Sequence, residues 1–327
     1  MKIAIVGCRH GHIFALYSLI KNNPEVEFAG AYEPHDATRE AAEATHGMHF
    51  PYDSLEAVLA DETVDAIAIG DYYAIRGAHA IAALKAGKHV ISDKPLCTSL
   101  AELDEIERLA TEGNLSVGLM LDLRYHKNIQ TAKALIDEGR LGAIHNVQFG
   151  GQHPLQYGTR PAWYFEEGKH GGTINDIAVH GVDLLTHLTG QTLAKVNAAR
   201  CYNAYAKEEP AFLDCGQFML TLSEGAGVIA DVSYAAPNSM GYAYPYYWEF
   251  HIFGDKGMLS FSVNSDGVTL CADGATAPEQ IPAVTPVGDT LASFLADIAG
   301  KPTMMTTAES IYASRATLLI QKAADEA

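Results

Sequence analysis

The first 120 residues alternate between short apolar runs and segments whose apolar residues recur at helical spacing. The apolar runs predict strands over Lys2–Val6, Val26–Tyr32, Asp65–Gly70, His89–Ser92 and Leu115–Leu119. Between them, the spacing predicts helices over Ile13–Lys21, Ala37–Thr45, Ala78–Ala86 and Leu100–Thr111. Strands that alternate with helices of about 10–15 residues indicate βαβ units and a parallel sheet.

After residue 122 the pattern becomes a series of strands separated by polar turns. Strands are predicted over Ile144–Phe149, Val196–Cys201, Gln217–Leu222, Gly227–Tyr234, Glu249–Phe253, Gly257–Val263 and Val268–Cys271. Helices are predicted over Ile129–Glu138, Asn175–Leu188 and Thr307–Ala324. The chain therefore reads as α/β, with a doubly wound parallel sheet of Rossmann type over residues 1–122. An α+β domain with a large open, mainly antiparallel sheet should follow over residues 123–327, and its last helix could pack back on the first domain.

Length and charge narrow the class of protein. At roughly 150 residues per domain, 327 residues agree with two domains. The net charge of −18 opposes binding to nucleic acids and to anionic membranes. No apolar stretch approaches the roughly 20 residues of a membrane span, and the run after Lys2 is short for a secretory signal. The five cysteines are scattered, so we expect a soluble cytoplasmic protein with reduced thiols.

The turn from Gly7 to His12 joins the first predicted strand to the first helix. In a Rossmann unit, the backbone amides of this turn meet a pyrophosphate. Gly7 fits the G-x-G-x-x-G spacing, whereas Arg9 and His12 stand at the second and third glycine positions. Arg9 could close over the pyrophosphate as a cation. Taken alone the signal is weak, because such turns also occur in α/β proteins that bind no dinucleotide.

Glu33 strengthens the interpretation, since it ends the second strand about 20 residues beyond the turn. An acid there binds the ribose 2′-hydroxyl and repels a 2′-phosphate, so NAD is favoured over NADP. Arg39 is close enough in sequence to leave NADP open, and Glu33 could instead be a solvated turn residue before Pro34.

A helical segment carries Asp176, His180 and Asp183, which helical spacing places on one face. His180 suits a general base, because its unperturbed pKa lies near neutrality, and Asp176 could orient the substrate or the imidazole. Equally, Asp176 could cap the helix and His180 could be a satisfied buried histidine. With His187 the same face could bind zinc or manganese, an alternative that we keep open while assigning no metal ligand.

Lys94, within Asp93-Lys94-Pro95, follows a predicted strand at the carboxyl edge of the parallel sheet. Ligands of open α/β sheets bind at that edge, and an ammonium there could stabilise an alkoxide. The alternative is a surface lysine before a proline turn.

Two aromatic segments are candidates for substrate contact. The first runs from His153 to Tyr164 and includes Trp163; sugar faces stack on such rings. It could also be an ordered surface loop. The second runs from Tyr242 to Trp248, where an oligomer contact is at least as good an interpretation.

Taken together, these motifs resemble the glucose–fructose oxidoreductase / inositol dehydrogenase / rhizopine catabolism (Gfo/Idh/MocA) family along nearly the whole chain. Asp93-Lys94-Pro95 corresponds to the family's E-K-P motif, and Gly171-Gly172 leading to Asp176 and His180 corresponds to its glycine-rich D-x-x-x-H motif. Where the family often has T-P-N, this chain has Gly70-Asp71-Tyr72-Tyr73.

The resemblance implies a dehydrogenase that moves a hydride between NAD(P) and a hydroxyl or carbonyl carbon of a sugar, polyol or sugar derivative. His180 would take the hydroxyl proton, Lys94 would steady the alkoxide and Asp176 would orient the substrate. Substrate contacts are expected from Arg124, His153, Trp163 and Asp183. Cofactor contacts are expected from Gly7, Arg9, His10, Gly11, His12, Glu33, Asp71, Tyr72, Lys94 and Pro95. The open sheet commonly forms an oligomer interface in the family, which implies a homodimer or homotetramer.

Two alternatives share the same residues. Some relatives keep NAD bound and use it for elimination or glycoside cleavage without net redox change. A non-catalytic regulator that binds NAD or sugar is the other, although it would have no need of the Lys94, Asp176 and His180 set.

Overall fold

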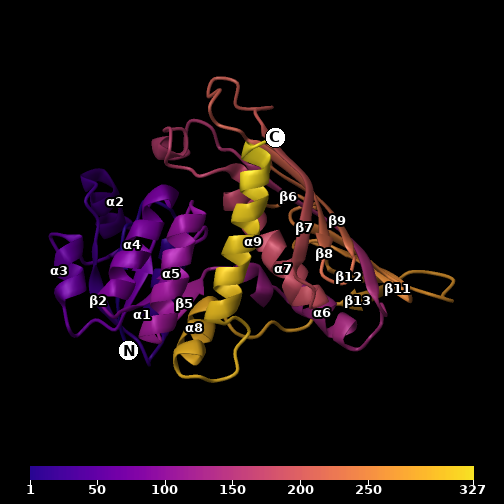
Figure 1. Cartoon of the computed structure of the whole chain (residues 1–327), viewed down its shortest axis with the longest axis horizontal. Helices are drawn as coiled ribbons and strands as arrows, with labels where there is room; N and C mark the ends of the chain where they lie inside the picture. The colour runs from indigo at the N-terminus through magenta and orange to yellow at the C-terminus, as the bar shows by residue number, and fades with distance from the viewer. The chain divides into compact units, whose positions relative to one another are not determined.

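The computed structural model describes all 327 residues, which form two compact units (Figure 1). The first unit comprises Met1–Met120, Pro161–Gly171 and Asp289–Arg315. The second comprises Leu121–Arg160, Gly172–Gly288 and Ala316–Ala327. The first unit thus includes two segments that follow the predicted domain boundary in the chain.

The first unit is built on a five-stranded parallel sheet in the order β2-β1-β3-β4-β5. Its strands are β1 (Lys2–Val6), β2 (Glu27–Tyr32), β3 (Ala66–Ile69), β4 (His89–Ser92) and β5 (Val117–Leu119). Every residue of β3 is buried, as expected for a parallel strand covered on both faces. The predicted parallel sheet is confirmed.

Helices accompany the strands of this sheet; in Figure 1 those from the first 120 residues are indigo to purple, and the one from the later part of the chain is gold. They are α1 (Ile13–Asn22), α2 (Asp36–His46), α3 (Leu55–Ala60), α4 (Tyr73–Lys85), α5 (Leu100–Gly113) and, from the later part of the chain, α8 (Thr290–Ile298). The chain leaves β1 toward β2 on one side, while β3 lies on the other side of β1. The strand order therefore reverses at β1, and ligands of such sheets bind beside the carboxyl ends of the strands at this point.

The second unit contains an eight-stranded sheet in the order β13-β12-β11-β10-β6-β9-β8-β7. The strands are β6 (Ile144–Pro154), β7 (Leu193–Tyr202), β8 (Cys215–Leu222), β9 (Gly227–Ala236), β10 (Glu249–Gly254), β11 (Gly257–Phe261), β12 (Gly267–Ala272) and β13 (Glu279–Pro282). Only β6 and β9 pair in parallel, so the prediction of a mainly antiparallel sheet is confirmed.

Helices α6 (Lys127–Asp137) and α7 (Val179–Thr189) pack against each other and against this sheet. The contact between α7 and β6 is close: a Cβ on Gly181 would lie 2.2 Å from the ring of Phe149. Directly before α7, Ile174–Ala178 form a π-helical turn rather than the regular helix that the spacing predicts. Single π-turns inside helices are frequent at functional sites.

The last helix, α9 (Thr307–Asp325), contributes to both units. Its first part belongs to the first unit, where Arg315 forms ion pairs of 2.6 Å with Asp104 and with Glu107 of α5. Among all the helices of the chain, none combines the length and the apolar character that crossing a membrane requires.

Candidate active site

The turn after β1 has the backbone that a nucleotide-binding turn needs. Gly7 adopts φ +75°, and a Cβ at this position would lie 2.4 Å from the Cβ of Asp71, which follows β3. The Gly7 amide donates to the Tyr32 carbonyl at 2.9 Å, and the His10 amide donates to the Gly70 carbonyl at 2.9 Å. Glycine at position 7 therefore lets the turn pass close to the end of β3, at the point where the strand order reverses.

Glu33 lies at the end of β2 with its side chain directed at the same turn. It is 2% exposed, and its carboxylate accepts hydrogen bonds from the amides of Cys8 (2.7 Å) and His35 (2.8 Å). Burial raises the pKa of Glu33, while these two amides oppose the rise. The carboxylate is thus fixed beside the turn, which is the place that a ribose contact requires.

Asp93 and Lys94 follow β4 at the same edge of the sheet, and both are buried. Arg76, a fully buried residue of α4, holds this segment. Its guanidinium donates to the carbonyls of Asp93 (2.8 Å) and Lys94 (2.6 Å) and to the Asp93 carboxylate (3.0 Å). The Lys94–Pro95 peptide bond is cis. Arg76 was not predicted from the sequence, because nothing in the α4 pattern marks an arginine as buried.

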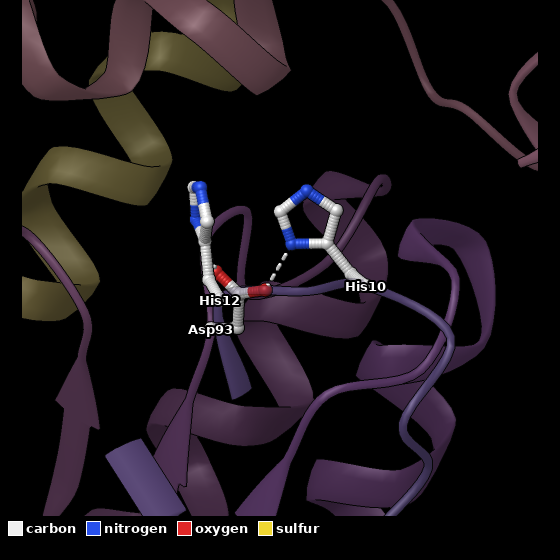
Figure 2. A group of neighbouring side chains, drawn as sticks. All are labelled: His10, His12 and Asp93. Carbon is white, nitrogen blue, oxygen red and sulfur yellow. Dashed lines mark hydrogen bonds and ion pairs between the residues drawn. The ribbon is translucent and has the colours of Figure 1, made fainter. Parts of the chain in front are cut away.

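Two histidines of the turn face Asp93 (Figure 2). The His10 Nδ1 atom hydrogen-bonds the Asp93 carboxylate, and the His12 Nδ1 atom lies 3.3 Å from its other oxygen. Burial lowers the pKa of His10 well below its ordinary value, while the charge of Asp93 opposes this shift. Although burial alone would raise the pKa of Asp93, the facing His10 and Arg76 hold it well below the usual range. The Asp93 carboxylate therefore lies among two imidazoles and a guanidinium.

Aromatic rings of the first unit enclose the other side of His10. Its Nε2 atom lies 3.2 Å from the Tyr73 hydroxyl, which is 2.7 Å from the Tyr164 hydroxyl. Trp163 is 0% exposed, and its indole N–H donates to the Arg9 carbonyl at 3.2 Å. The burial of Trp163 counts against the predicted sugar-stacking role: the ring packs behind the nucleotide turn instead.

The remaining predicted cofactor residues also lie at this edge. Asp71 is buried and accepts a hydrogen bond from the Tyr72 amide at 2.7 Å. The Lys169 ammonium lies over the Tyr72 ring, 5.1 Å from the ring centroid. Gly11 is exposed, with space around its Cα. The turn and the loop after β3 are therefore neighbours within the first unit.

In the second unit, Asp176 lies in the π-helical turn and is 2% exposed. The Tyr234 hydroxyl, from β9, donates to its carboxylate. The residues that lead into this turn pack closely against α9, because a Cβ on Gly172 (φ +98°) would lie 2.3 Å from the Gln321 side chain. Tyr234 was not predicted, since only the sheet brings it next to Asp176.

His180, in the first turn of α7, is 6% exposed. Its Nδ1 atom lies 3.7 Å from the carboxylate of Asp122, whose side chain is 76% exposed. The two side chains therefore form a His–Asp pair within the second unit. Asp122 is a residue that the sequence reasoning missed, although it follows a predicted strand within three residues, as Lys94 does.

Arg124 and Asp183, both predicted as substrate contacts, bind each other in the structure. Arg124 Nε and Nη2 lie 2.8 and 2.6 Å from the two Asp183 oxygens, and the side chains are 1% and 2% exposed. A buried, two-point ion pair of this kind has a structural role. Arg124 binds Asp183, and the Tyr234 hydroxyl binds Asp176. Both acids of the helix face that could bind zinc or manganese therefore have protein partners.

An aromatic cluster lies next to His180 within the second unit. The rings of His180 and Trp248 are 5.6 Å apart, Trp248 and His153 are 5.7 Å apart, and His153 is 5.7 Å from Tyr242. Tyr242 is 41% exposed, whereas Trp248 is buried. Trp248 also has φ +51°, a strained backbone conformation for a bulky residue, and such strain concentrates at functional sites.

The fold thus combines a Rossmann-type nucleotide-binding sheet, which has a glycine turn where its strand order reverses, with a second unit built on a large open sheet. Residues 1–120 match the model of the oxidoreductase family with an NAD-binding Rossmann fold. Residues 129–260 match the model of the GFO/IDH/MocA C-terminal domain. The chain belongs to the Gfo/Idh/MocA oxidoreductase family, and the resemblance noted in the sequence is confirmed.

Individual relatives are distant. The D-xylose dehydrogenase of Paenarthrobacter nicotinovorans is 30% identical over 44% of this chain and 38% of its own length. The scyllo-inositol 2-dehydrogenase (NADP(+)) of Bacillus subtilis is 26% identical over 54% of this chain and 50% of its own length. The chain thus spans half or less of these curated relatives. A putative oxidoreductase from Erwinia carotovora atroseptica has the same fold, with a TM-score of 0.89 at 23% identity, covering 99% of this chain and 98% of its own.

Proposed function

We propose that this protein is an NAD(P)-dependent dehydrogenase that oxidises a hydroxyl carbon of a sugar or polyol, or reduces the matching carbonyl. The observation that carries the proposal is the buried His180 with Asp122 at 3.7 Å from its Nδ1 atom. A histidine poised in this way can accept the proton that a hydroxyl loses on oxidation. Membership of the family supports the same reaction class.

Oxidation of an alcohol removes one proton and one hydride. Nicotinamide dinucleotide supplies the hydride acceptor when it is bound. Among the chain's own residues, we assign proton acceptance to His180, whose imidazolium Asp122 would stabilise. The Lys94 ammonium would stabilise the negative charge that develops on the substrate oxygen.

Asp176 would then orient the substrate. Its carboxylate is held by the Tyr234 hydroxyl, so it has a defined position from which to accept hydrogen bonds from sugar hydroxyls. The ring series from Trp248 through His153 to the exposed Tyr242 supports a carbohydrate substrate, because sugar faces pack on aromatic rings.

We also propose NAD rather than NADP. Glu33 is fixed at the end of β2, where its charge would repel a 2′-phosphate. Arg39, the nearby cation that could have bound such a phosphate, donates instead to Asp36 (2.6 Å) and to the Glu33 carbonyl (3.3 Å).

The open sheet supports a homodimer or homotetramer as the working assembly. Met219 on β8 and Ile229 on β9 are half exposed on the face of that sheet, at 49% and 50%. Pairing of two such faces would bury these apolar side chains.

The test is a screen of sugars, inositols and sugar acids for NADH formation, using wild-type protein and the His180→Ala variant. We expect turnover by wild type on at least one polyol. The variant should lose at least about 100-fold in kcat, the lower end of what a general base contributes, with nearly unchanged NADH affinity. Equal activity of the variant would refute the base assignment. Tightly bound NAD without net reduction of any substrate would refute a net dehydrogenase.

A further inference from the structure

Three side chains that can bind metals converge in the first unit, and none of the roles proposed above uses them as a group. They are His10 and His12, from the turn after β1, and Asp93, from the end of β4 (Figure 2). Their candidate ligand atoms all lie within 4.8 Å of one another. Figure 2 shows both imidazole rings beside one carboxylate, from opposite sides.

One ligand separation in this group matches that of a shared ion. Zinc binds histidine nitrogen and carboxylate oxygen at about 2.0–2.2 Å in tetrahedral geometry, which puts neighbouring ligand atoms roughly 3.3 Å apart. The His12 Nδ1 and Asp93 Oδ1 atoms are separated by 3.3 Å. His10 Nδ1 now hydrogen-bonds Asp93 Oδ2, and a metal ion would replace the proton between them.

Buried residues behind the group hold two of the three ligands in position. The Tyr73 hydroxyl lies 3.2 Å from His10 Nε2, so it can accept the proton of that nitrogen and leave Nδ1 as the donor to a metal. Arg76 holds Asp93 Oδ2 at 3.0 Å, which leaves Oδ1 directed at His12. Partners of this kind, which fix a histidine tautomer and a carboxylate orientation, are typical of metal sites.

The burial pattern of the group also fits. His10 and Asp93 are 7% and 0% exposed, whereas the His12 side chain is 53% exposed. An ion bound here would therefore have protein ligands on its inner side and solvent on its outer side. Two imidazoles and one carboxylate suit zinc-class ions, because magnesium and calcium prefer oxygen ligands alone. The Arg76 cation weakens the electrostatic attraction between the Asp93 carboxylate and a divalent ion. The site therefore favours an ion that binds strongly to its two histidine nitrogens.

We propose that His10, His12 and Asp93 bind one divalent transition-metal ion of the zinc class, with at least one coordination position open to water or to an oxygen of a bound molecule. The proposal does not depend on the proposed dehydrogenase activity. Metal binding can be measured in the absence of nucleotide and of substrate.

The test uses tag-free, chelator-treated protein of full length. Zn²⁺ binding is measured by equilibrium dialysis and Co²⁺ binding by its visible absorption, which is strong for four-coordinate nitrogen and oxygen sites. We expect one ion per chain. The His12→Ala variant should weaken Zn²⁺ binding by at least about tenfold, since even supporting residues cost 10–100-fold. His12 is half exposed, so this change should leave the fold intact.

Two further variants make the result specific. The His145→Ala variant removes an exposed histidine of the second unit and should bind Zn²⁺ as wild type does. Tyr73→Phe removes the hydroxyl next to His10 Nε2 and should weaken binding, although it removes no ligand. Absence of a stoichiometric ion in wild type would overturn the proposal, and the group would be a hydrogen-bonded Asp–His pair. Equal binding by wild type and His12→Ala would overturn it too.

Discussion

Replacing Asp183 with Asn should destabilise the second unit by about 3–5 kcal/mol, because it leaves the Arg124 guanidinium buried without its counter-charge. The two hydrogen bonds of the pair measure 2.8 and 2.6 Å, and neither side chain is more than 2% exposed. Water therefore cannot replace the lost carboxylate. The free energy of unfolding can be measured in urea through the fluorescence of Trp248, in a Trp163→Phe background that removes the other tryptophan.

The matched control replaces both partners, as Arg124→Met with Asp183→Leu. Apolar substitutes for a buried ion pair are often neutral or stabilising, so this double variant should recover most of the lost stability. If Asp183→Asn unfolds within about 1 kcal/mol of its parent, the pair has no major structural role. The two side chains would then be available for the substrate contacts that the family resemblance implies. If the double variant is as unstable as the single one, the cost arises from packing rather than from charge.

Two smaller predictions concern the residues around the proposed chemistry. Tyr234→Phe removes the hydrogen-bond donor to the buried Asp176 carboxylate. It should lower the free energy of unfolding in the same urea assay by about 1.5–3 kcal/mol, the range for hydrogen bonds to charged groups. An unchanged unfolding midpoint would show that this hydrogen bond contributes little. Glu33→Gln removes the negative charge that would repel a 2′-phosphate. The ratio of the dissociation constants for NADPH and NADH should fall by about tenfold, which corresponds to 1.4 kcal/mol. An unchanged ratio would contradict the ribose role.

The sheets and most helices could be predicted from the sequence, because burial imposes a period on their residues. The fully apolar β3 and the alternating β8 are examples, since one strand is covered on both faces and the other on one. Helix α3 was missed because only Val58 of its six residues is buried, so no periodic stripe exists. Strand β13 was missed because it is an exposed edge strand. Helix α8 did carry a signal, the Asp289 cap that accepts from the Ala292 amide.

The site could be predicted only as far as strand ends locate it. Gly7, Glu33 and Lys94 each follow a strand of the parallel sheet, and the carboxyl ends of parallel strands meet at one edge. Pairings across long stretches of sequence could not be foreseen, such as Arg124 with Asp183 or Tyr234 with Asp176. They depend on tertiary packing that periodicity does not encode. For the same reason, the sequence showed Trp163 as a candidate sugar contact, although packing buries it.

Dependence on a nicotinamide cofactor can be tested by titrating the purified protein with NADH and NADPH while nicotinamide fluorescence is followed. Denatured protein is assayed first for co-purified nucleotide. We predict saturable binding with NADH tighter than NADPH. Gly7→Ala should weaken NADH binding, because its Cβ would meet Asp71 at 2.4 Å, whereas Gly227→Ala, in the second unit and with space around it, should bind as wild type does. Binding of neither nucleotide, with none co-purified, would contradict the account.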